Sequence, residues 1–160
     1  MSTFAQPKKT HAAIMNIRIA LADYDFVSGD RMLEKLSGVL RSSAPAISRD
    51  GGRLTRVTEQ GVTAIFENGS EAALKAAMDI FHSITNESRA GGQPSLSIGI
   101  HAGNVILSEF SYNGVTVPVT VSDGQHIPWK LCGAAARYNA RILMTKTALD
   151  SVRSFDTRFN

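Results

Sequence analysis

The sequence contains one cysteine, Cys132, among its 160 residues. A single thiol cannot close an intramolecular disulfide or supply a multi-thiolate zinc site, which excludes disulfide-stapled secreted scaffolds and zinc-ribbon domains. We therefore expect packing to hold the fold and the chain to work in a reducing compartment. The length and the 43% share of hydrophobic residues are sufficient for one globular domain with its own core.

Long apolar runs are also missing. No segment approaches the roughly 20 apolar residues that a helix needs to span a bilayer. The N-terminal stretch MSTFAQPKKTHAA has no apolar region of the kind found in signal peptides. We expect a cytoplasmic location, with membrane attachment only through domains outside this chain.

The excess of positive charge is small, with 17 basic against 14 acidic side chains. Two of the basic residues, Lys8 and Lys9, lie within residues 1–14, which show no pattern and which we expect to form a disordered leader. The remainder is nearly neutral and has no aromatic-rich RNA-binding strand. A nucleic-acid partner is therefore not expected.

Hydrophobic periodicity predicts an α+β fold. Residues 14–22 read as a buried strand, and residues 29–44 have helical spacing that ends near Pro45. The other predicted elements are a hairpin at 53–58 and 61–66, a helix at 70–87, strands at 96–101, 104–110 and 114–121, a helix at 131–138, a strand at 142–144 and a final helical turn at 147–152. This order predicts a ferredoxin-like βαββαβ core with extra strands and a C-terminal α-β-α unit, in which helices pack on a mostly antiparallel sheet.

A carboxylate, Asp23, follows the first predicted strand directly. At the rim of a sheet it can help to hold a magnesium ion through oxygen ligands and substrate phosphates. The alternative is that Asp23 or Asp25 caps the next helix or forms an Asx turn, and spacing alone favours this alternative. Because this fold hosts many unrelated functions, the function has to be inferred from the site residues and not from the fold.

Five segments, in their order along the chain, resemble the catalytic domains of class III nucleotide cyclases. They are IALADYDFVS, RVTEQGVTAIF, EAALKAAMDIF, SIGIHAG and KLCGAAARYNARILMTKTALDSV. The resemblance covers about residues 15–155, so residues 15–160 are expected to form a cyclase homology domain. We expect this domain to end before the family's final strand.

In that family, two carboxylates hold two metal ions at the reacting phosphate. The resemblance places the first carboxylate at Asp23 and the second at Gln60, a neutral amide. Glu59 is the candidate substitute, although adjacent residues of a strand point to opposite faces. Magnesium or manganese is the expected cofactor if nucleotide binding is retained.

The resemblance also assigns the nucleotide contacts. The base-reading lysine of the family corresponds to Arg56, and the second base reader lies near His126. The transition-state pair corresponds to Gly133, which has lost the asparagine side chain, and to Arg137, which is retained. We expect His101 and Cys132 to be packing residues.

Losses in both halves of the family's site imply a degenerate cyclase homology domain with little or no activity alone. Its expected role is regulatory, dimerising or nucleotide-sensing in intracellular signalling, with ATP or GTP as the possible ligand. The family's sites lie between two chains, which implies a homodimer or a heterodimer with another cyclase-like chain. The alternatives are an active adenylate or guanylate cyclase that works with a partner chain, and an unrelated ferredoxin-like binding module.

Overall fold

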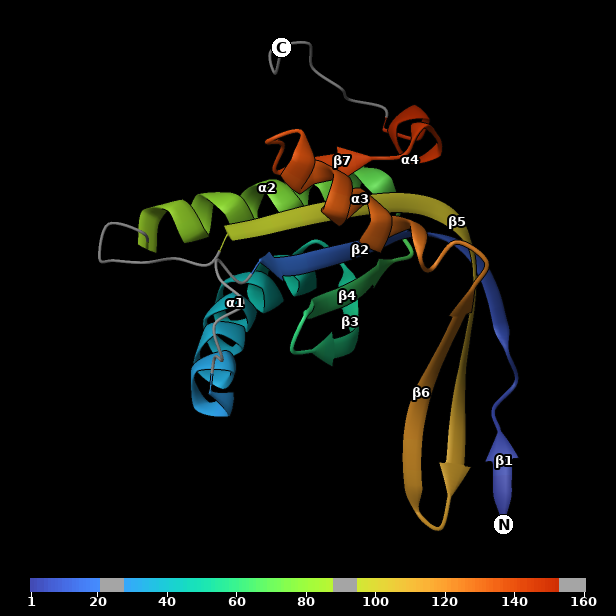
Figure 1. Cartoon of the computed structure of the whole chain (residues 1–160). Helices are drawn as coiled ribbons and strands as arrows, with labels where there is room; N and C mark the ends of the chain where they lie inside the picture. Colours follow the sequence, from blue (N-terminus) through green and yellow to red (C-terminus); the bar gives the residue numbers. More distant parts are fainter. Residues whose placement is uncertain (21–27, 88–94, 153–160) are drawn as a thin grey trace.

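The computed structural model describes residues 1–20, 28–87 and 95–152. Its elements are β1 (Ser2–Phe4), β2 (Lys8–Ala20), α1 (Gly29–Arg49), β3 (Gly52–Thr58), β4 (Gly61–Phe66), α2 (Ser70–Glu87), β5 (Ser95–Tyr112), β6 (Val115–Ser122), α3 (Ile127–Arg137), β7 (Ile142–Met144) and α4 (Lys146–Asp150) (Figure 1). Within the described ranges, no helix has the length and apolar content that crossing a membrane requires.

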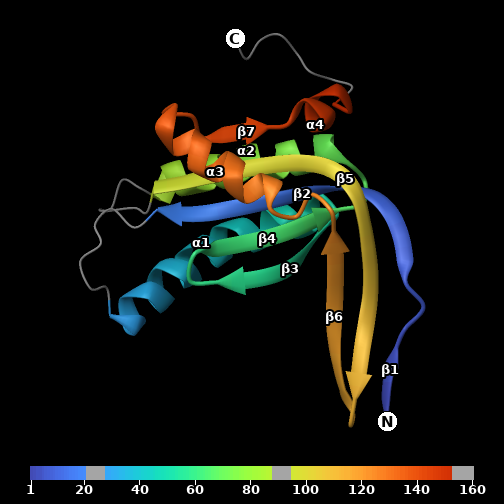
Figure 2. The ribbon, with the colours of Figure 1, turned by 45° about the vertical axis from the view of Figure 1, so that its right-hand side comes forward.

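Seven strands form one sheet in the order β1-β5-β2-β4-β3, with β6 and β7 also paired to β5. Every pairing is antiparallel except that of β7 with β5. The longest pairing joins β2 to β5 along all of β2. In Figure 2, α3 crosses in front of β5 and β2, whereas α1 and α2 lie behind the sheet. The predicted α+β class, with its mostly antiparallel sheet and packed helices, is confirmed.

The strand β2 is apolar on both faces because both faces are covered. Met15 and Ile17 belong to the large core that α1 and α2 complete. Ile14, on the opposite face, packs with Ile65 and Val105 in a second, smaller core. Alternation along the strand separates the two sets, as a pleated backbone requires.

Helix α1 continues beyond the predicted end at Pro45 and reaches Arg49. A proline within a helix removes one backbone hydrogen bond and crowds the preceding turn. Burial of Val39, Ala46 and Ile47 at helical spacing offsets this cost, because all three pack into the large core. Tertiary packing has therefore overridden the local stop signal.

The strands predicted at 96–101 and 104–110 are one strand, β5. Gly103 lies between them but pairs with Ala12 of β2, so the hydrogen-bonded ladder runs through the glycine without a break. The C-terminal part of β5 leaves the main sheet and forms a projecting ribbon with β6 and β1 (Figure 1).

The segment expected to be a disordered leader is built into the sheet instead. Ser2–Phe4 pairs with Phe110–Tyr112 of the ribbon, and β2 already begins at Lys8. The rings of Phe4 and Phe110 lie 5.0 Å apart between centroids. Most of residues 1–11 are exposed, which explains why no apolar pattern marked them as strand.

One face of the ribbon is apolar and exposed. Directly paired residues such as Phe110 and Val117 share a face, and alternate residues along each strand lie on that same face. Its exposed apolar members are Phe4, Ile106, Tyr112, Val115, Val117 and Val121. Lys9, which pairs with Ile106, lies on the same face where the ribbon meets the main sheet. The opposite face carries polar side chains, among them Glu109 and Thr116. The ribbon is therefore amphipathic.

Close packing fixes α3 against the sheet. A Cβ atom at Gly99 of β5 would lie 2.1 Å from the carbonyl oxygen of Pro128 in α3. With its amide oxygen facing α3, the buried Asn16 accepts a hydrogen bond from Trp129 Nε1 at 2.8 Å and donates one to Thr63 Oγ1 at 2.9 Å. The close approach at Gly99 and the hydrogen bond to Trp129 hold the first turn of α3 directly on β5 and β2.

We predict that Gly99→Ala lowers the free energy of unfolding by about 2–3 kcal/mol, because the added methyl group meets a backbone atom that cannot rotate away. Urea denaturation followed by circular dichroism measures the change. Gly38→Ala in α1 is the matched control, since nothing lies within 4 Å of its added Cβ. The control should raise stability by about 0.5–1 kcal/mol, and equal effects of both substitutions would contradict the packing argument.

Cys132 is fully buried in α3, with its Sγ atom 3.3 Å from the Asn16 carbonyl oxygen. Burial raises the pKa of this thiol to about 11, so it stays protonated at neutral pH. We predict that iodoacetamide at pH 8 labels the native protein at least about 100-fold more slowly than the urea-unfolded chain. Mass spectrometry gives both rates, and comparable labelling of the two states would contradict this placement.

Candidate functional site

The exposed side of α3 lines a hollow of about 450 Å³. The residues that line it are Arg18 of β2 and Trp129, Lys130, Gly133, Ala134 and Arg137 of α3. The structure therefore brings together Gly133 and Arg137, the two positions that the resemblance assigned to a transition-state pair. We refer to this hollow as the α3 groove.

Three cationic side chains, Arg18, Lys130 and Arg137, line the α3 groove, and all three residues are exposed. No ion pair joins any of them to an acidic residue in the described part of the chain. The groove is thus an electropositive surface that attracts anions. Arg18 was not among the residues that the sequence analysis singled out.

Arg56 lies on the same face of the sheet as α3. It pairs with Thr63 of β4, and Thr63 pairs in turn with Asn16, whose side chain contacts Trp129. Arg56 is exposed but does not line the α3 groove. An irregularity in the pairing between Leu54 and Arg56 precedes it.

His126 occupies the N-cap position of α3 without a capping hydrogen bond from its side chain. It lies at the opposite end of the helix from Arg137, about 16 Å away along the axis at 1.5 Å per residue. The structure therefore does not bring His126 into the α3 groove, and its expected role as a base reader stays a prediction.

Glu59 and Gln60 are exposed at the tip of the β3–β4 hairpin. The Gln60 carbonyl oxygen accepts a hydrogen bond from the Ile19 backbone N–H at 3.0 Å. The tip consequently lies beside the C-terminal end of β2, from which the chain continues toward Asp23. Asp23 and Asp25 themselves fall outside the described residues.

The possible metal ligands at this hairpin tip do not suit a pair of divalent ions. They comprise the carboxylate of Glu59 and the neutral amide of Gln60, whereas magnesium is usually held through carboxylates and phosphates. Over residues 1–20, 28–87 and 95–152, no group of three or more His, Cys, Asp or Glu side chains is arranged to hold a metal ion.

His101 of β5 is partly buried, and its Nδ1 atom lies 3.1 Å from Thr145 Oγ1. Burial lowers the pKa of His101, and the charges of His11 and His126 lower it further. The surroundings therefore favour the neutral imidazole over the imidazolium. A hydrogen bond to the segment between β7 and α4 fits the expected packing role.

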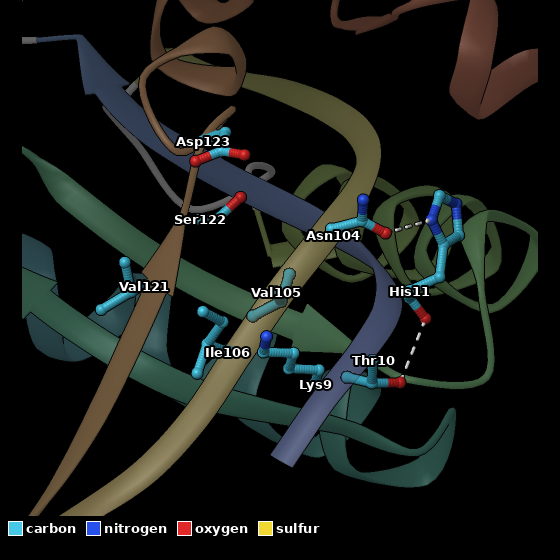
Figure 3. A pocket seen from close by; sticks show the side chains of 9 residues that line it. All are labelled: Lys9, Thr10, His11, Asn104, Val105, Ile106, Val121, Ser122 and Asp123. Atoms are coloured by element: carbon cyan, nitrogen blue, oxygen red, sulfur yellow. Dashed lines mark hydrogen bonds between the residues drawn. The ribbon is translucent and has the colours of Figure 1, made fainter. Parts of the chain in front are cut away.

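A second hollow of about 450 Å³ lies where the ribbon meets the main sheet (Figure 3). Its polar lining includes His11 and Asn104, whose Nδ1 and Oδ1 atoms are 3.5 Å apart, together with Ser122 and Asp123. Sequence reasoning did not single out this place, because it depends on the bend of β5. None of the candidate site residues that the structure describes lines it.

Comparisons with known proteins find no matching family model and no matching curated protein. Solved structures do match. A bacterial light-regulated adenylyl cyclase superposes with a TM-score of 0.80 at 16% identity, over 91% of this chain and 46% of that chain. The chain thus spans about half the length of that protein.

Two guanylyl cyclases are also similar. The guanylyl cyclase domain of the RhoGC fusion protein from the aquatic fungus Blastocladiella emersonii, in a non-canonical dimeric form, gives a TM-score of 0.75 at 14% identity, over 94% of this chain and 86% of that chain. The guanylyl cyclase Cya2 gives 0.71 at 12% identity, over 91% and 79%. Over about nine-tenths of its length, this chain has the fold of the class III nucleotide cyclase catalytic domain.

Proposed function

We propose that this chain is a degenerate cyclase homology domain that binds a nucleotide and assembles with a second cyclase-like chain in intracellular signalling, with little or no cyclase activity alone. The observation that carries the proposal is the α3 groove. It retains Arg137 but has Gly133 where the resemblance calls for an asparagine.

Two separate deficits support low activity. At the hairpin tip, Gln60 stands at the position of the second metal-binding carboxylate. In the groove, Gly133 provides no side-chain donor for the transition state. Removal of one preorganised donor commonly costs about 100- to 1000-fold in rate. When the two halves of a site come from different chains, a homodimer carries both deficits in every pocket.

The cationic residues support retained binding. Arg137 can contact phosphates, and Arg56 presents a forked donor to a base edge on the same face of the sheet. Arginine is not equivalent to lysine at such a position, because its charge is delocalised over a planar fork. ATP and GTP are therefore the nucleotides to test.

We predict that the wild-type protein, incubated with manganese and ATP or GTP, forms no more cyclic nucleotide than its Asp23→Ala variant. The double variant Gln60→Asp/Gly133→Asn should gain about 100-fold in rate, since it restores one group in each half-site. A Cβ atom at position 133 meets Arg18 Nη1 at 3.5 Å, which is an ordinary contact with the end of a flexible side chain that can move aside for an asparagine. Chromatographic detection of cyclic AMP and cyclic GMP gives the rates.

Two outcomes bear on the alternatives. Wild-type turnover that disappears in Asp23→Ala would contradict degeneracy and favour an active cyclase in which Glu59 serves as the second carboxylate. Calorimetric titration of the wild type with ATP and GTP tests the binding part separately. An absence of heat with both nucleotides would remove nucleotide sensing and leave an assembly role.

We predict a dimer in solution. Exposed apolar side chains run along one face of the ribbon, and exposed apolar surface of this kind usually marks an interaction site. Light scattering of the wild type should give twice the monomer mass. Val117→Lys should shift the equilibrium toward monomer, because it places a charge on the apolar face. Thr116→Lys adds the same charge to the opposite face and should leave the dimer intact.

A monomer at all concentrations would contradict the proposed assembly. Dissociation by both lysine variants would show that added charge, and not the apolar face, controls it.

A further inference from the structure

We infer that the α3 groove is a polyphosphate-binding site in which the guanidinium group of Arg18 takes the place left by the missing side chain at Gly133. The inference rests on the proposed function, because it concerns the same groove. It deepens that function by naming the part of the ligand, a chain of phosphates, that the groove would hold. It adds two residues, Arg18 and Lys130, that the sequence did not single out.

Arg18 lies beside the position of the missing side chain. Its side chain leaves the face of β2 that also carries Asn16, on which α3 is docked. A Cβ atom built at Gly133 would lie 3.5 Å from Arg18 Nη1, and among the described residues no other atom outside the adjoining stretch of α3 comes within 4 Å. The guanidinium group therefore reaches the space that a side chain at position 133 would enter.

The other two cations of the groove lie on α3. Lys130, Gly133 and Arg137 follow one another at helical spacing, so they share one face of α3. Lys130 and Arg137 are two turns apart, about 10 Å along the axis. Arg18 reaches the helix between them, beside Gly133. Three positive charges are thus spread along one hollow.

The chemistry of the groups indicates the ligand. A guanidinium fork forms paired hydrogen bonds with phosphate oxygens, and the lysine adds a point charge. A spread of about 10 Å exceeds the size of one phosphate group and suits a chain of two or three. Gly133 and Ala134 contribute almost no side chain, which lets such a chain approach the helix closely.

The three cations of the groove have no acidic partners among the described residues. No described carboxylate forms an ion pair with Arg18, Lys130 or Arg137. Elsewhere in the described chain, cations such as Arg49 and Lys75 are paired with Asp50. The groove therefore keeps its positive charge available for an external anion.

Calorimetric titration with sodium tripolyphosphate tests the inference on the whole chain. We expect binding that weakens with added salt, and a dissociation constant about tenfold or more higher in Arg18→Gln and in Lys130→Gln. Arg18→Lys keeps the charge and should fall between Arg18→Gln and the wild type. Arg31→Gln, which removes one exposed charge from α1, is the control and should bind like the wild type. Thermal unfolding establishes that each variant is folded.

No binding by the wild type would overturn the inference, as would an equal loss in Arg18→Gln and Arg31→Gln. The inference and the proposed function can fail independently of each other. Tripolyphosphate binding without ATP or GTP binding would support the groove and contradict nucleotide sensing. Nucleotide binding that is unchanged in Arg18→Gln would support nucleotide sensing and overturn the role of Arg18.

Discussion

The close approach of α3 to β5 at Gly99 is the contact on which the candidate site depends. No side chain fits between the two backbones there, and the buried amide of Asn16 adds a directional bond to Trp129. Because these contacts fix the first turn, the positions of Lys130 and Arg137 along the helix follow from them. A shift of the helix by a fraction of a turn would turn both cations away from Arg18.

The strand β2 connects the two halves of the candidate site. Its last residues hold the hairpin tip through the bond between Ile19 and Gln60, and Arg18 beside them belongs to the α3 groove. Adjacent residues of this strand thus contact different parts of the site. The side chain of Arg18 points away from one face of the sheet, whereas the backbone N–H of Ile19 bonds within the plane of the sheet. Changes to β2 are therefore expected to affect both halves together.

Much of this architecture was accessible from the sequence, because local periodicity reports burial directly. The hairpin of β3 and β4 and the helix α2 were predicted close to their observed bounds. The ribbon was not, since β1 and the start of β2 are exposed and Gly103 looked like a break. The role of Arg18 was beyond reach as well. It depends on the docking of a helix that begins 109 residues later in the chain.

The edge strand at one end of the main sheet affects how readily the protein aggregates at high concentration. The strand β3 is an edge strand, and an exposed edge can recruit the strands of other molecules into growing aggregates. Here the edge carries Arg53 and Arg56, and the pairing irregularity at Leu54 interrupts its regular geometry. Like charges and a broken register oppose stacking edge to edge. The same arginine that is a candidate base reader thus also helps to keep the molecules from polymerising through their sheets.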